Sequence, residues 1–283
     1  AFEHSIPDWL VETLEKELGE NWEKEMIALN EQAPTILRAN SLKTSTKHLI
    51  EELKHENVES FQVPGFENAV QLEEKKNVFL TSAFKDGFFE VQDAGSQKIG
   101  EFLDVKPGMR VVDACAGAGG KTLHLAALME NKGQIIAMDI HGWKLAELKR
   151  RAKRAGAHNI ETREITDNKV IKRLHEKADR LLIDAPCSGL GVLKRNPDSK
   201  WKIDQDFIDR IRKEQETILQ DYSKIIKKGG KMVYATCSIL PSENNEQVEN
   251  FLKNNPDFKL VKEEKVMPST GFDGFYMALI ERV

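Results

Sequence analysis

From residue 101 onward, short apolar stretches alternate with segments of helical periodicity, and this alternation constrains the fold of the 283-residue chain more than any other feature. Near-continuous apolar strands that alternate with helices are typical of a parallel sheet covered on both faces. The predicted strands are 110–114, 134–139, 159–164, 180–184 and 231–236, and the predicted helices begin at Lys121 or span 143–155 and 206–226. We therefore predict a doubly wound α/β sheet, a fold that binds ligands outside the carboxyl ends of its strands.

The first 92 residues follow a different pattern. Apolar residues recur at helical spacing over 8–30, which predicts one or two amphipathic helices. Short strand-like segments and one further helix follow, at 35–40, 47–56, 61–63, 69–72 and 88–91. We predict a small α+β domain over residues 1–92 and the larger α/β domain over residues 93–283.

The first strand of the α/β part runs into a loop of small residues. Asp113 ends the strand, and the loop consists of Cys115, Ala116, Gly117, Ala118, Gly119, Gly120 and Lys121, followed by Thr122. A P-loop would need glycine at 115 and a dinucleotide G-x-G-x-x-G would need glycine at 122, so neither pattern is met. Asp139 ends the next strand, about 20 residues past the glycines, where an acid suits two ribose hydroxyls. The small-residue loop and Asp139 together favour a binding site for S-adenosylmethionine (SAM). The alternatives are a site for another nucleotide or a purely structural turn.

Cysteine usage indicates a reduced protein. The chain has three cysteines and no C-x-x-C, so neither a zinc site nor a disulfide scaffold is predicted. Cys187 follows one apolar strand in Asp184-Ala-Pro-Cys-Ser, and Cys237 follows another in Thr-Cys-Ser. Either cysteine alone is more often a packing residue. If the two strands are neighbours, both thiols face one cleft beside the loop, which favours a catalytic role.

The net charge of −4 hides an uneven distribution. Residues 1–100 carry −9 and the remainder +5, with a basic run over 144–154. That run is interpreted as a solvated helix face or as a phosphate-contacting patch, together with Lys194 and Arg195. The first dozen residues carry Glu3, Asp8 and Glu12 rather than a basic and then apolar leader. With no stretch of 18 apolar residues, these features predict a cytoplasmic protein without a membrane partner.

These motifs resemble those of the RNA (cytosine-5)-methyltransferases of the Sun-type, RsmB-like group. The segments that carry the resemblance are 113–122, 184–189, 195–201, 234–238 and 273–275, with 37–40 and 91–94 in support. The resemblance implies a Rossmann-like SAM-dependent methyltransferase sheet with a smaller, RRM-like N-terminal domain. It also implies methylation of C5 of a cytosine in structured RNA, with 16S ribosomal RNA as the expected substrate and tRNA as the alternative.

The resemblance assigns roles to individual residues. C5 of cytosine is a poor nucleophile until a thiolate adds to C6, and this role falls to Cys237. Cys187 then assists product release, and Asp184 stabilises the charge that develops on N3. SAM is expected to contact Asp139, Asp167, Asp184 and the loop from Cys115 to Lys121 (Cys115, Ala116, Gly117, Ala118, Gly119, Gly120, Lys121).

Two departures from the family pattern stand out. Ala118 replaces the usual proline of the loop, and the segment 165–168 around Asp167 differs from the usual Gly-Asp-type sequence. A competing hypothesis is a non-catalytic RNA-binding or ribosome-assembly protein that retains the fold. An amino-group methyltransferase is disfavoured because Asp184-Ala-Pro-Cys187 lacks Asn/Asp-Pro-Pro-aromatic, and DNA remains an alternative substrate. We expect a monomer and no metal.

Overall fold

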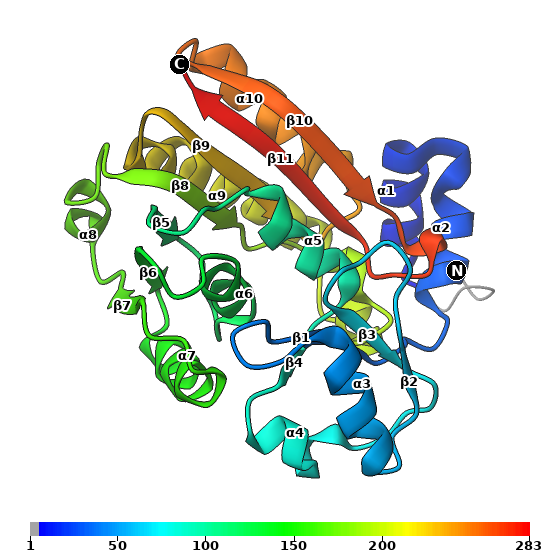
Figure 1. The fold of residues 1–283 in the computed structure, drawn as a ribbon. Coiled ribbons are helices and arrows are strands. Elements are labelled where there is room, and N and C mark those ends of the chain that lie inside the picture. The colour runs from blue at the N-terminus through cyan, green and yellow to red at the C-terminus, as the bar shows by residue number, and fades with distance from the viewer. Residues whose placement is uncertain (1–5) are drawn as a thin grey trace.

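A seven-stranded mixed sheet forms the centre of the molecule in the computed structural model, which describes residues 6–283 (Figure 1). Residues 1–5, with Glu3 and the start of the predicted N-terminal domain, lie outside the described residues. The strands are β5 (Arg110–Asp113), β6 (Gln134–Asp139), β7 (Ile160–Glu164), β8 (Ala178–Asp184), β9 (Ile226–Thr236), β10 (Phe258–Val266) and β11 (Phe275–Arg282). Their order is β10-β11-β9-β8-β5-β6-β7.

The strands from β9 to β7 are parallel, as the sequence predicts, but β11 runs antiparallel to both β9 and β10. The five predicted strands all lie in this parallel part, and β10 and β11 are two further strands that the sequence analysis did not predict. β10 is an exposed, charge-rich strand without a clear apolar period, so its sequence does not predict a strand. Only the segment 267–274 joins it to β11, and so short a connection suits antiparallel strands, because parallel strands need a long crossover.

Helices cover both faces of this sheet, since successive strand residues point to opposite faces. On one face, Val112 and Ile136 pack with residues of α9 and α10. On the other face, Val111 and Ile135 pack with residues of α5 and α6. Figure 1 shows α5 and α6 in front of the sheet and α9 and α10 behind it. The helices are α5 (Ala94–Phe102), α6 (Gly120–Leu128), α7 (Gly142–Ala155), α8 (Asn168–Lys172), α9 (Gln205–Tyr222) and α10 (Asn245–Asn254).

The N-terminal part contains a second, four-stranded antiparallel sheet of order β2-β3-β1-β4. Its elements follow the order βαββαβ of a ferredoxin-like fold. They are β1 (Ile36–Ala39), α3 (Thr46–His55), β2 (Ser60–Gln62), β3 (Ala69–Leu72), α4 (Ser82–Lys85) and β4 (Phe89–Val91). Leu37, Leu49, Val70 and Phe89 form its core, which confirms the predicted α+β architecture.

The first two helices, α1 (Asp8–Leu18) and α2 (Trp22–Leu29), pack mainly on the larger sheet's loops. Leu10 and Met26 share a cluster with Leu190, Ile208 and Leu240. They therefore cover segments that follow Cys187 and Cys237. The domain boundary at residues 92 and 93 stays a prediction, and it falls between the end of β4 and the start of α5. No helix in residues 6–283 is long and apolar enough to cross a membrane.

Candidate active site at the strand ends

The carboxyl ends of β5, β8 and β9 meet at one edge of the sheet. Asp113 pairs in register with Leu182, and Asp184 pairs with Ala235. The predicted neighbourhood of the two cysteine-bearing strands is thus confirmed. As a result, segments that are 50 positions apart in the chain lie side by side.

The glycine-rich loop after β5 is held from two sides. Gly117 N and His141 N donate to the two carboxylate oxygens of Asp139, each at 2.9 Å. Gly119 has φ of 91°, and a Cβ on it would lie 2.5 Å from Cγ of Leu148, so glycine is required there. The loop therefore lies close to α7, with its backbone open toward the cavities described next.

A cavity of about 270 Å³ lies over the ends of β5 and β6, and its lining fits SAM. Each carboxylate oxygen of Asp139 accepts one hydrogen bond from a backbone N–H and can accept one more. The carboxylate can therefore also accept hydrogen bonds from the two hydroxyls of a ribose. Ile140, Ile165 and Ile218 provide apolar surface for a flat ring. The complete lining is Ala114, Cys115, Gly117, Asp139, Ile140, His141, Lys144, Ile165, Asp184, Pro186, Glu214, Ile218 and Tyr222.

A second, more open cavity of about 390 Å³ lies on the other side of the loop. Ala116, Ala118, Gly119, Gly120 and Lys121 line it, together with Asp113, Arg195, Asp273 and other residues. Cys115, Gly117 and Asp184 line both cavities. Two ligands bound in these cavities would therefore approach each other beside Asp184.

Asp184 and Lys121 form an ion pair between the cavities. Lys121 Nζ donates to Oδ2 of Asp184 at 2.7 Å, with both side chains mostly buried. Burial lowers the pKa of Lys121, but the charge and hydrogen bond of Asp184, with a further charge interaction from Cys237, outweigh it and raise that pKa. Lys121 is therefore a cation held by Asp184.

The thiols of Cys187 and Cys237 lie in contact at the same edge. Their Sγ atoms are 3.1 Å apart, and both cysteines are free and partly buried. The hydrogen bond to Cys237 and burial raise the pKa of Cys187 well above its ordinary value. The raised pKa favours the thiol form of Cys187, and either sulfur can be the donor in this contact. The third thiol, Cys115, has a pKa raised by burial and lies in the loop.

Asp113 is a buried acid under the second cavity. Thr122 Oγ1 donates to its Oδ2 at 2.7 Å, while Oδ1 is buried and has no hydrogen-bond partner among the described residues. Burial raises its pKa to about 7, against the hydrogen bond from Thr122. This carboxyl therefore titrates near neutral pH.

Cys187 and Cys237 line neither of these cavities, although Pro186, next to Cys187, lines the first one. Asp167 also lines neither cavity. It is exposed, and its carboxylate accepts from Lys169 N at 2.7 Å as the N-cap of α8. Its local sequence, which departs from the family pattern, is that of a helix start.

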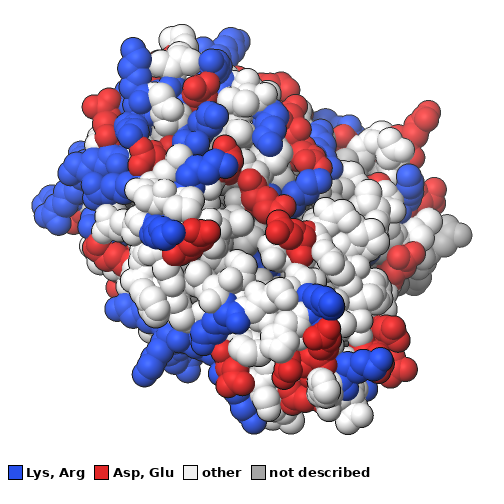
Figure 2. Space-filling view, viewed as in Figure 1, with Lys and Arg blue, Asp and Glu red and all other residues white. Residues whose placement is uncertain are grey.

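Part of the predicted phosphate-contacting patch serves another purpose. Arg151 and Arg154 of α7 both pair with Glu90 of β4, at 2.9 and 2.6 Å, and Arg151 also donates to the carbonyl of Ala118. Arg195 pairs with Asp93 and Asp273. These arginines join the two sheets and the loop. Figure 2 shows other basic side chains on the side of the molecule where α7 lies, and acidic ones over the small N-terminal sheet.

Sequence reasoning did not identify the acid Glu90, nor did it pair Lys121 with Asp184. Glu90 lies 61 positions before Arg151, and Lys121 lies 63 positions before Asp184. The motifs placed Lys121 and Asp184 at strand or helix ends, but no pattern in the sequence signals which distant residues meet.

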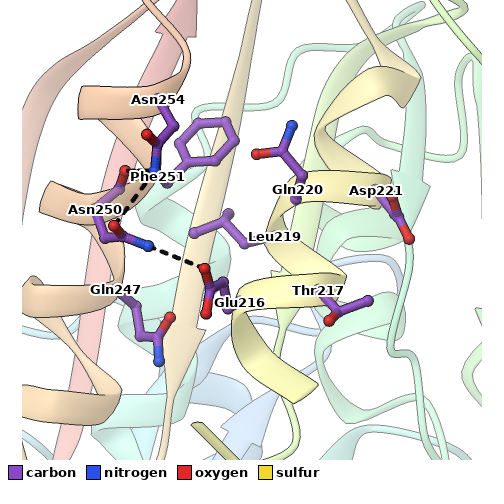
Figure 3. A pocket seen from close by; sticks show the side chains of 9 residues that line it. All are labelled: Glu216, Thr217, Leu219, Gln220, Asp221, Gln247, Asn250, Phe251 and Asn254. Atoms are coloured by element: carbon purple, nitrogen blue, oxygen red, sulfur yellow. Dashed lines mark hydrogen bonds between the residues drawn. The ribbon is translucent and has the colours of Figure 1, made fainter. Parts of the chain in front are cut away.

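Another cavity of about 250 Å³ lies between α9 and α10 (Figure 3). Amide and carboxylate side chains line it, and Asn250 Nδ2 donates to Glu216 Oε1 at 3.3 Å. It contains no cysteine and lies away from the strand ends, so it is not the candidate active site. Among residues 6–283, no group of three or more His, Cys, Asp or Glu side chains is arranged to hold a metal ion.

Comparisons with known proteins identify the family of the chain and several relatives. Residues 101–280 match the family model "16S rRNA methyltransferase RsmB/F", and residues 6–79 match the ferredoxin-like domain of RsmF/B-like methyltransferases. A probable ribosomal RNA small subunit methyltransferase B of Synechocystis is 36% identical over 91% of this chain. The chain spans only 58% of the length of that relative.

Solved structures resemble the whole chain. The crystal structure of PH0851 has a TM-score of 0.95 and 32% identity, and the match covers 99% of this chain and 67% of that one. NSun6 from Pyrococcus horikoshii, solved with SFG, has a TM-score of 0.90 at 22% identity, with 99% of each chain covered. The second likeness supports the fold alone.

Proposed function

The chain belongs to the RsmB/F family of 16S rRNA methyltransferases, and from this premise we propose that it methylates C5 of a cytosine in RNA through a covalent bond between Cys237 and C6. The observation that carries the proposal is the contact of 3.1 Å between the two thiols beside Asp184. SAM, when bound against Asp139 and the loop from Cys115 to Lys121, supplies an electrophilic methyl group. The other steps fall to side chains of this protein.

Cys237 is the proposed nucleophile. Its Sγ forms a bond to C6, and the electron pair of the C5–C6 double bond becomes available at C5. Lys121, whose charge interacts with Asp184 and Cys237, offsets the negative charge of a thiolate. The raised pKa of Cys187 favours its thiol form, which can donate to a Cys237 thiolate 3.1 Å away before the attack; this hydrogen bond is lost once Sγ of Cys237 bonds to C6.

Asp184 is the proposed partner of the base at N3. Lys121 donates to Oδ2, and among residues 6–283 no donor is bound to Oδ1. Neither the ion-paired carboxylate nor N3 of cytosine carries a proton, so the proton that Oδ1 and N3 share is taken up from solvent when the base binds. A proton held there offsets the negative charge that builds on N3 when sulfur adds to C6. The cavity of about 390 Å³, which Lys121 and Asp184 line, is the proposed place for the flipped cytosine. Cys237 does not line this cavity, so the base has to enter deeply enough for C6 to reach its Sγ.

Cys187 is proposed to act in product release. After methylation, C5 carries both a proton and the new methyl group. Removal of that proton restores the C5–C6 double bond and expels Cys237 as a thiolate. Cys187 lies in contact with Cys237 and is therefore placed to assist proton removal and to reprotonate or stabilise the departing sulfur.

The proposed substrate is small-subunit ribosomal RNA in the cytoplasm, where thiols stay reduced. The proposed contacts to the RNA backbone are three exposed basic residues of α7, namely Lys149, Arg150 and Lys153. Arg150 pairs only with Glu147 on the surface of the same helix, whereas Arg151 and Arg154 are held by the buried Glu90. The proposed role of the N-terminal domain is to position the RNA by shape, since the first 100 residues carry −9.

The test uses labelled 16S rRNA, tRNA and SAM with three proteins. We expect the wild type to transfer methyl groups to C5 of cytosine in the rRNA. Cys237→Ala should abolish both methylation and covalent adduct, whereas Cys187→Ala should accumulate an adduct that survives denaturation. The opposite pattern for the two cysteines would refute the assigned roles. SAM binding without methyl transfer to any RNA would favour the non-catalytic assembly protein.

A further inference from the structure

Glu243 is a buried carboxylate that contacts the serines following both cysteines. It lies in the turn after β9, and its side chain is fully buried. Its Oε1 accepts from Ser188 N at 2.8 Å, and its Oε2 accepts from Ser188 Oγ at 2.6 Å and from Ser238 Oγ. Ser188 directly follows Cys187, and Ser238 directly follows Cys237. One carboxylate therefore joins the two cysteine loops.

Each serine hydroxyl is oriented by its own loop. Ser188 Oγ accepts from Leu190 N at 3.4 Å, and Ser238 Oγ accepts from Leu240 N at 3.1 Å. A hydroxyl that accepts from a backbone N–H still has its single proton to donate. Ser238 Oγ donates to Glu243, and Ser188 Oγ lies 2.6 Å from Glu243 Oε2 and 3.3 Å from Ser238 Oγ. Glu243 is thus the acceptor that both hydroxyls share, in turns that are also joined by the hydrogen bond from Gly191 N to Cys237 O.

Gln215 of α9 extends this contact to the residue before Cys187. Its Nε2 donates to Glu243 Oε1 and to the carbonyl of Pro186, each at 3.0 Å. With this bond, Glu243 accepts from four donors, which is the full capacity of a carboxylate. A buried carboxylate is tolerated only when its oxygens are satisfied in this way. The contacts thus fix the carboxylate relative to both loops.

We propose that Glu243 is a positioning residue that holds Cys187 and Cys237 at their Sγ–Sγ distance of 3.1 Å. The thiols lie 50 positions apart, after the paired strands β8 and β9, and the strand pairing and the hydrogen bond from Gly191 N to Cys237 O bring the two loops together. Glu243 adds side-chain hydrogen bonds to both loops beyond these backbone contacts. Glu243 touches neither thiol and acts through Ser188 and Ser238. The effect of Glu243 on methyl transfer rests on the proposed function, whereas its effect on the spacing of the thiols does not.

The test measures how readily the two thiols join in the 283-residue chain. Equilibration with glutathione forms the Cys187–Cys237 disulfide, while one glutathione disulfide takes up two electrons and the two thiol protons and yields two glutathione thiols. Peptide mapping by mass spectrometry quantifies the bond. In Glu243→Gln, two donors lose their acceptor and the loops gain freedom. We expect the equilibrium constant for disulfide formation to fall at least tenfold.

Glu25→Gln is the matched control. Glu25 is also a buried carboxylate, and it accepts from Ser269 N at 2.8 Å and Ser269 Oγ at 2.7 Å. It holds a different loop, so its loss should lower Tm without changing the thiol equilibrium. A wild-type equilibrium constant in Glu243→Gln would overturn the proposal, and so would an equal fall in Glu25→Gln.

Ser238→Ala provides a milder variant if Glu243→Gln does not fold. It removes one hydroxyl donor and leaves the carboxylate in place, so a smaller fall in the same direction is expected, and no fall overturns the proposal. In methylation assays, Glu243→Gln should lower kcat with KM for RNA unchanged. A wild-type protein that methylates no RNA would refute the proposed function, whereas the thiol equilibrium would still decide the role of Glu243.

Discussion

Replacing Asp113 by asparagine tests how strongly burial acts on the acid beneath the active site. The pKa of Asp113 is raised from 3.8 to about 7, with burial as the main cause. Between these pH values the folded protein binds more protons than the unfolded chain. The stability linked to this carboxyl is therefore complete below pH 3.8 and is lost as pH rises through about 7.

A difference of one pKa unit between the folded and unfolded states corresponds to about 1.4 kcal/mol in the free energy of unfolding. Through this group alone, the free energy of unfolding of the wild type should fall by about 2.5 kcal/mol between about pH 5 and about pH 8. Asp113→Asn has no proton to lose there, and its amide oxygen can still accept from Thr122. Relative to the wild type, the variant should therefore gain about 2.5 kcal/mol at the higher pH.

Urea unfolding of both proteins at the two pH values, without ligand, measures this gain. Asp206→Asn, which removes an exposed carboxylate from the start of α9, is the control for loss of one charge. A stability difference between wild type and Asp113→Asn that is the same at both pH values would refute the reasoning. A difference that shifts in favour of the wild type at the higher pH would refute it as well.

Three further changes test the loop and its support. Asp139→Ala should weaken SAM binding about 10- to 100-fold, because it removes a carboxylate acceptor, and an unchanged Kd in calorimetry would contradict this. Glu90→Gln leaves Arg151 without its buried partner and should cost about 3–5 kcal/mol in urea unfolding, while a cost below about 1 kcal/mol would show that the pair is dispensable. Gly119→Ala should destabilise the fold by about 1–3 kcal/mol, since its Cβ would overlap Leu148, and an unaltered Tm in scanning calorimetry would argue against the overlap.

Much of the site followed from local sequence patterns and their order. Apolar strands and helical periods are short-range features, and parallel strands place their carboxyl ends at one edge. Asp139, Asp184, Cys187 and Cys237 could therefore be assigned to that edge without coordinates. Asp167 shows the limit of this reasoning. It also follows a strand, but its side chain does not reach either cavity and instead caps the N-terminus of α8.

The tertiary structure alone decided which distant side chains meet. It turned Arg151 from a predicted RNA contact into a partner of Glu90, and it brought Glu243 to both cysteine loops. It also added the antiparallel edge of β10 and β11, in which β10 is exposed and charge-rich and carries no strand period, whereas β11 is apolar and mostly buried. Periodicity reports which face of an element is buried. Ion pairs and hydrogen bonds between residues far apart in the chain depend on how those elements pack, and that packing is a property of the whole fold.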